Sequence, residues 1–315
     1  MDVLAPPEPP PLPDAPEAAS GALARPLGYP ALDRFLEPGD RVIVAAPSLA
    51  TTGESLRFAV GAILAAARRA GVASIAVHAA PDADAPRVEV EPASFGRVRV
   101  HRAFAGADRI VAVSGIAFDP LLGFEGSLAA LLRIAADPST RDRAIAAGAL
   151  REFADRLGPV FSVEVAFQRG GRPSAIFAGE PGAAHRAARA YWSRWRGVAV
   201  GPGYAGVVAE VKNPRARDAA ASLLLAARAA RPGGIVALAG PTPDLAELSA
   251  PLARAVRELA STHSVVYAPD LEQALRVLRR RLPEDGIAHV PDPLRTLPSI
   301  DVLPNPGGER IPSAP

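Results

Sequence analysis

The sequence predicts an α/β fold of two domains, in which mainly parallel sheets are flanked by helices. Two observations predict it. Short apolar runs without polar alternation, such as 41–46 and 109–114, are typical of strands buried on both faces of a parallel sheet. Helical patterns alternate with such runs along the chain, and a strand–helix–strand unit occupies residues 41–79. This alternation favours helices on both faces of each sheet.

The first domain is expected over residues 17–195. Gly71 predicts the end of a helix, because glycine readily adopts the left-handed conformation found at helix C-termini. The turn Arg-Gly-Gly-Arg at 169–172 predicts that the strands on either side of it are joined directly. The expected strands are 41–46, 73–79, 98–101, 109–114, 160–167 and 174–177. Strand 73–79, like strand 41–46, is predicted to be buried. The expected helices are 17–27, 55–70, 127–136, 144–157 and 181–195.

The second, smaller domain is expected over residues 196–290. A linker at 196–204 with a Gly-Pro-Gly turn introduces it, and a strand at 286–290 closes it. Between them, strands and helices again alternate. The expected strands are 206–211, 235–239 and 265–267, and the expected helices are 216–230, 246–261 and 271–282.

Both ends of the chain are rich in proline. Residues 1–16 are expected to form a strap, since the run PPEPPPLPDAP at 6–16 favours an extended polyproline II conformation without helix or strand. Residues 291–315 are expected to form a tail. A protein partner that binds these Pro-rich termini is one open possibility.

Composition excludes several classes of function. The net charge is +2, and the arginines are scattered among acidic residues, so no nucleic-acid partner is predicted. The longest apolar stretch, 58–67, spans about ten residues, which is too short to cross a membrane. The chain has no cysteine, which excludes disulfides and thiolate metal sites. The first residues lack a secretory signal pattern, so a cytoplasmic protein is expected.

Five segments, in the same order and at similar spacing, resemble the lactate racemase family. They cover nearly the whole chain, and their combination carries the resemblance. The segments are VLAPPEPPPLPD at 3–14 with ARPLGYPAL at 24–32 and PGDRVIV at 38–44; GRVRVHRAFAGADRIVAVSG at 96–115; IFAGEPGAAHRA at 176–187; RPGG at 231–234; and GIAHVPDPLRTLP at 286–298.

The resemblance implies a cleft between two domains and a nickel-pincer nucleotide tethered to a lysine. Family members racemise or epimerise 2-hydroxy acids by moving a hydride between substrate and cofactor. The run that matches the family's tether loop is DPLLGFEGSLA at 119–129. Ala129 stands at the position of the lysine, and the only lysine, Lys212, is too far downstream to replace it. Gly123 and Gly126 match the family's glycines, which indicates that the backbone shape of the loop is still required.

Other chemical positions of the family are also changed. Asp119 stands where the resemblance places an acid/base histidine, and His78 lies a few residues before the position of the second. Leu132 lies near the position of the nickel ligand. No histidine pair has metal-ligand spacing, so no metal site and no cofactor are predicted. The motifs that match 47–50 and 218–221 have lost their charged side chains.

The remaining polar side chains give two groups of candidates. The first could exchange protons, and the second lies at a strand-to-helix turn or in the glycine loop, where backbone N–H groups can bind an anion. His185, one turn into a helix, is expected to be an exposed structural residue. The catalytic candidates are Asp119, His78 and Glu125, and the ligand-binding candidates are Ser48, Thr51, Thr52, Gly123 and Gly126.

Three functions follow from these observations. The first is a lactate-racemase-like protein without nickel-pincer catalysis, whose cleft binds a small anionic ligand or a partner. The second is a divergent 2-hydroxy acid racemase or epimerase, an isomerase that uses Asp119, His78 and Glu125. The third is a structural or interaction subunit that acts through its Pro-rich termini.

Overall fold

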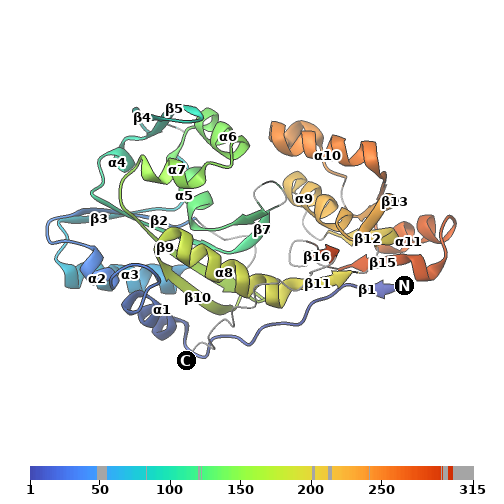
Figure 1. The fold of residues 1–315 in the computed structure, drawn as a ribbon, viewed down its shortest axis with the longest axis horizontal. Helices are drawn as coiled ribbons and strands as arrows, with labels where there is room; N and C mark the ends of the chain where they lie inside the picture. Colours follow the sequence, from blue (N-terminus) through green and yellow to red (C-terminus); the bar gives the residue numbers. More distant parts are fainter. Residues whose placement is uncertain are drawn as a thin grey trace. The chain divides into compact units, whose positions relative to one another are not determined.

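A computed structural model describes residues 1–47, 55–82, 84–119, 121, 123–200, 203–211, 215–240, 242–291, 293 and 297–300, except for the side chains of 199, 245 and 297–300. The chain divides into two compact units (Figure 1). Unit 1 comprises Met1–Pro6 and Arg196–Pro315, and unit 2 comprises Pro7–Trp195. The first six residues therefore belong with the C-terminal part of the chain and not with a separate strap.

Unit 2 is built on a five-stranded sheet in the order β10-β9-β6-β2-β3. All neighbouring pairs are parallel except β9 and β10, which form an antiparallel hairpin. This confirms the prediction of a mainly parallel sheet. The strands are β2 (Arg41–Ala45), β3 (Ser74–His78), β6 (Arg109–Gly115), β9 (Val160–Phe167) and β10 (Pro173–Gly179).

Helices cover both faces of this sheet, which explains the unbroken apolar runs of its central strands. On one face lie α1 (Ala15–Ala24), α2 (Leu32–Phe35) and α3 (Arg57–Ala70), and α3 ends at Gly71 in the left-handed conformation, as predicted (Figure 1). The other face carries α5 (Ser127–Ala135), α6 (Pro138–Ala146) and α7 (Leu150–Asp155), with α4 (Arg102–Ala105) and the hairpin of β4 (Arg87–Ala93) and β5 (Gly96–His101). Helix α8 (Pro181–Arg196) ends the unit.

Three predictions for unit 2 were wrong in detail. Strand β3 is not buried: it is the edge strand, and Val77 is exposed. The single helix expected at 144–157 is two helices, because Gly148 has φ of +64° and interrupts the α-helical backbone between α6 and α7. Strand β4 was missed, although its Val-Glu-Val-Glu alternation is typical of a hairpin strand with one exposed face.

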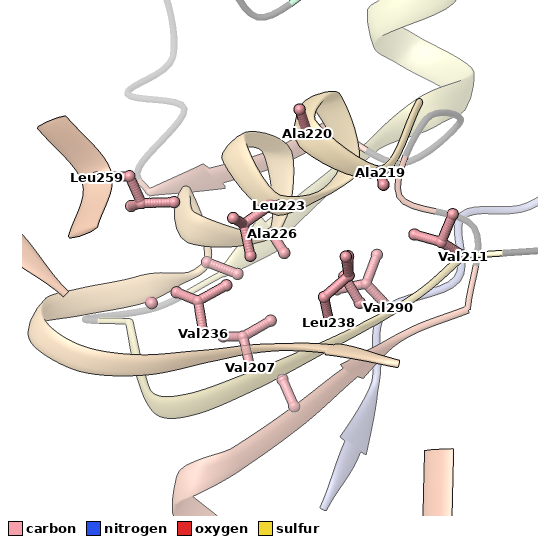
Figure 2. Close-up of a cluster of buried hydrophobic side chains, with 14 of the residues drawn as sticks. Val207, Val211, Ala219, Ala220, Leu223, Ala226, Val236, Leu238, Leu259 and Val290 are labelled. Atoms are coloured by element: carbon pink, nitrogen blue, oxygen red, sulfur yellow. The ribbon is translucent and has the colours of Figure 1, made fainter. Parts of the chain in front are cut away.

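Unit 1 contains a second five-stranded sheet in the order β1-β15-β12-β13-β14, parallel throughout. Helices α9 (Ala216–Ala227) and α10 (Ala250–Thr262) pack on one face, and α11 (Leu271–Arg279) packs on the other. Figure 2 shows the core beneath α9, where Leu223 and Ala226 face Val207, Val236 and Leu238 of the sheet. The strands are β1 (Asp2–Val3), β12 (Tyr204–Glu210), β13 (Ala230–Ala239), β14 (Ser264–Ala268) and β15 (Ile287–Val290), with short 3-10 helices at Leu245–Glu247 and Glu284–Gly286.

Parts of both Pro-rich ends have defined hydrogen-bonding partners. Residues 7–14 lie against the β9–β10 hairpin, where Leu12 N–H donates to Pro173 O (2.8 Å) and Gln168 Nε2 donates to Pro9 O (2.6 Å). The expected linker contains strand β11 (Gly197–Val200), which pairs in parallel with β16 (Leu297–Ile300) from the expected tail. No helix in the described part of the chain combines the length and the apolar character needed to cross a membrane.

Candidate functional site

A cavity of about 500 Å³ lies in unit 2 where several helix ends meet. The starts of α5 and α8 form two of its walls, and the turn between α6 and α7 forms a third. The hairpin of β7 (Ala117–Asp119) and β8 (Gly123–Glu125) contributes the rest. Its lining residues are Leu121, Phe124, Gly126, Leu128, Ala129, Ile145, Gly148, Leu150, Arg151, Glu180, Pro181, Gly182, His185 and Arg186.

A buried carboxylate stands behind this cavity. Glu164 is the one acidic residue of the apolar strand β9 and is 1% exposed. Its Oε1 accepts hydrogen bonds from Ser127 N–H (3.2 Å) and Ser127 Oγ (3.0 Å), and Ser127 Oγ also lies 2.8 Å from Ser162 Oγ. A buried charge needs several donors to replace the water it has lost, and Ser127 at the start of α5 supplies two of them.

The third donor to Glu164 is His185. Its Nδ1 lies 3.1 Å from both carboxylate oxygens, and its side chain is 33% exposed, so His185 is half-buried and not exposed as predicted. Since the carboxylate accepts but cannot donate, Nδ1 carries the proton. Nε2 is then the nitrogen with which His185 can contact a ligand in the cavity that it lines. A carboxylate that fixes the tautomer and orientation of a histidine is a recurrent feature of acid/base and ligand-binding sites.

Two arginines line the cavity and differ in their surroundings. Arg151 makes ion pairs with Asp155 (2.9 Å) and with Glu180. Although burial opposes it, hydrogen bonds from Arg151 and from the N–H groups of Gly182 and Ala183 hold the pKa of Glu180 below its ordinary value. Arg186 is exposed and has no ion-pair partner among the described residues. It is therefore the cation that a ligand can reach without breaking an existing pair.

The aromatic wall of the cavity is supported from behind. Phe124 packs edge-on against Trp192, with ring centroids 5.5 Å apart, and Trp192 is 5% exposed. The guanidinium of Arg189 lies 5.3 Å from the Phe124 ring centroid. These contacts fix the β7–β8 hairpin on α8 and so hold Phe124 in the wall.

The predicted site residues fall into separate environments. Gly126 and Ala129 line the cavity, whereas Asp119, Glu125 and His78 do not belong to its lining. Asp119 is buried, and its Oδ1 accepts a hydrogen bond from Leu121 N–H (2.8 Å). Glu125 forms an ion pair with Arg133 at 2.7 Å.

The other candidates lie elsewhere or outside the described residues. His78 ends the edge strand β3 and packs against His101 and Phe104, with ring centroids 5.2 Å apart in each case. Gly123 pairs with Asp119 across the β7–β8 hairpin and has φ of +77°. The predicted anion-binding positions Ser48, Thr51 and Thr52 lie outside the described residues.

Sequence reasoning missed Glu164 and Arg186 and misjudged His185. One signal pointed to Glu164: a single carboxylate inside an eight-residue apolar strand must find partners in the fold. Its partner lies 21 residues downstream on a helix, and no spacing rule connects the two positions.

Two positions that the sequence resemblance assigns to the nickel-pincer cofactor have apolar side chains in this structure. Ala129, where the resemblance places the tether lysine, is 2% exposed and has only a methyl group as its side chain. Leu132, near the position expected for the nickel ligand, is buried in the core beneath α5. Among the described residues, no group of three or more histidine, aspartate or glutamate side chains is arranged to hold a metal ion.

The two α/β units and their mainly parallel sheets define a lactate-racemase-like fold. No protein-family description and no curated protein matches the chain. Among solved structures, it is similar to the lactate racemase apoprotein from Thermoanaerobacterium thermosaccharolyticum, with a TM-score of 0.69 and 14% identity over 91% of this chain and 93% of that one. A protein from Thermotoga maritima matches with a TM-score of 0.56 and 12% identity over 91% and 98%. The similarity confirms the predicted fold.

Proposed function

We propose that this chain is a divergent lactate-racemase-family protein that binds a small anionic ligand in the cavity of unit 2 and does not carry out nickel-pincer catalysis. The fold and the five family-like segments support the relationship to the family. The observation that carries the proposal is Ala129. It lies in the wall of a cavity large enough for a small molecule, at the position where the family's lysine would tether the cofactor.

The polar groups of the cavity support an anionic ligand. Arg186 is without an ion-pair partner among the described residues, and His185 offers Nε2 as a donor whenever the ring is protonated. Both lie at the start of α8. A carboxylate or phosphate placed there would meet two positively charged donors on one turn of helix.

Two measurements test this function. The protein isolated from its native cells is expected to contain no stoichiometric nickel by elemental analysis and to have the mass of the unmodified chain. A covalent adduct or one nickel per chain would overturn the loss of pincer catalysis. Calorimetric titration with inorganic phosphate and with oxalate tests anion binding. Arg186→Gln is expected to weaken binding, and Arg254→Gln, an exposed arginine of α10, is the matched control.

A second candidate is a divergent racemase or epimerase. The geometry of His185 favours it, since a histidine held by a buried carboxylate at a cavity wall is suited to proton transfer. Interconversion of the two enantiomers of a 2-hydroxy acid by the pure protein, lost in His185→Gln, would favour this candidate over the first.

A further inference from the structure

The cavity of unit 2 is lined by both polar and apolar side chains, and we call His185 and Arg186 its polar end. His185 and Arg186 stand at the start of α8. Arg151 of α7, which is paired with Glu180, also lines the cavity. The remaining walls include side chains without hydrogen-bonding groups, contributed by the β7–β8 hairpin, α5, α6 and α7. They are Phe124, Leu128, Ile145 and Leu150. A ligand that matches both kinds of lining carries one charged group and an apolar body, because burying apolar surface against these walls is favourable and burying a second charge is not.

The charge of the buried network decides what the polar end can accept. Glu164 accepts its hydrogen bonds from Ser127 and from His185 Nδ1, so with a neutral imidazole the network carries one net negative charge. The other charged groups that line the cavity are Arg186, Glu180 and Arg151, of which Arg151 pairs with both Glu180 and Asp155. An anion next to Nε2 would be repelled by Glu164 unless His185 also carried a proton on Nε2.

We propose that the cavity binds a carboxylic acid with an apolar body, whose carboxylate contacts His185 and Arg186, and that binding takes up a proton at His185. The inference rests on the anion site proposed above and names the ligand class and the pH response of that site. The bound state then contains two carboxylates, Glu164 and the ligand, on either side of one imidazolium ring. Each ring nitrogen donates to one of them.

Calorimetric titration of the full chain with octanoate tests the proposal. Saturable one-to-one binding is expected. In buffers of different ionisation enthalpy, the observed heat should show that binding takes up protons. Affinity should fall as the pH rises. Binding that releases protons, or that is independent of pH between 6 and 8, would overturn the role of His185.

Two variants assign the effect to the polar end. His185→Gln is expected to abolish proton uptake and weaken octanoate binding, because glutamine cannot become charged. Arg186→Gln is expected to weaken binding at least severalfold while leaving proton uptake in place. His263→Gln and Arg254→Gln, which change residues of unit 1 outside this cavity, should bind like the unmodified chain. Equal effects in the test and control variants would contradict the site.

Two further probes separate this inference from the proposed function. Octan-1-ol has the apolar body without the charge, and inorganic phosphate has the charge without the apolar body. Octanoate binding that is much tighter than that of either probe supports the inference. If phosphate binds at Arg186 and octanoate does not, the inference fails and anion binding stands. If octanol binds as well as octanoate, the carboxylate has no role and the inference fails. If no anion binds, both proposals fail.

Discussion

The carboxylate of Glu164 occupies the space that a Cβ atom on Gly126 would fill. A Cβ built at Gly126 approaches all the carboxylate atoms of Glu164 more closely than real Cβ atoms ever come to a neighbour. The backbone at Gly126 has φ of −161°, which any residue adopts, so space and not conformation requires glycine here. The position of the Glu164 side chain therefore depends on the absence of a side chain at Gly126. Glu164 in turn contacts Ser127 and His185.

Gly126→Ala is expected to destabilise unit 2 and to displace Glu164. Forcing an extra methyl group into a packed site costs about 1–3 kcal/mol in the free energy of unfolding. Urea denaturation measures this cost. If the clash with Glu164 is the cause, adding Gly126→Ala to a chain that already carries Glu164→Ala should cost little, and this double-mutant cycle isolates the pair. Equal costs in both backgrounds would contradict the explanation.

Glycine is favoured at position 123 for a different reason. Its φ is +77°, and a Cβ there would meet nothing within 4 Å. Gly123→Ala is therefore expected to cost only the left-handed conformation, about 1 kcal/mol, and Gly123→Asn less, because asparagine tolerates that region. The same urea experiment measures it. Glu164→Ala should leave the cost of Gly123→Ala unchanged, in contrast to Gly126.

Glu164→Gln tests the buried network directly. Because His185 Nδ1 lies 3.1 Å from both oxygens of Glu164, the NH₂ group of the amide faces the Nδ1 proton in either orientation and disturbs this contact. An unsatisfied buried polar group costs about 1–3 kcal/mol in the free energy of unfolding. Glu89→Gln, which breaks an exposed ion pair with Arg97, is the control and should change stability by less than about 1 kcal/mol. A loss of the same size in both variants would argue against a buried network.

Much of the fold could be predicted from the sequence, because the parallel strands at the centre of each sheet are buried on both faces. Strands β2, β6 and β9 are continuous apolar runs for that reason, and Gly71 ends α3 as expected. An apolar run does not reveal its place in a sheet, however. Strand β3 has the pattern of a central strand and lies at the edge.

The site could be predicted only in part. The loop at 119–129 was found from its resemblance to a family loop, and its Gly126 and Ala129 do line a cavity. The two glycines were attributed to one cause, backbone shape, which holds for Gly123 and not for Gly126. The contact between Glu164 and His185 depends on how α8 packs against β9. No local spacing encodes such packing, so this part of the site emerges only from the tertiary structure.

Unit 1 contains a buried histidine whose protonation should oppose folding. His289 in β15 is 8% exposed, and its Nε2 lies 3.4 Å from Glu210 Oε2 at the end of β12. Burial lowers the pKa of His289 below 6.5, although Glu210 acts in the opposite direction. Burial also lowers the pKa of His101 in unit 2, where His78 and Arg87 add to the effect.

These shifts predict that stability falls on mild acidification. Because the folded pKa of His289 is depressed, the unfolded chain gains a proton below pH 6.5 that the folded chain does not bind. The contribution of neutral His289 to the free energy of unfolding is therefore complete above pH 6.5. It is lost as the pH falls from 6.5 toward the pKa of His289 in the folded protein. Urea denaturation at pH 7.5 and pH 5.5 measures the change. His289→Gln should reduce the difference between the two pH values without removing it, since His101 contributes with the same sign. A His289→Gln chain with an undiminished difference would refute the role of His289.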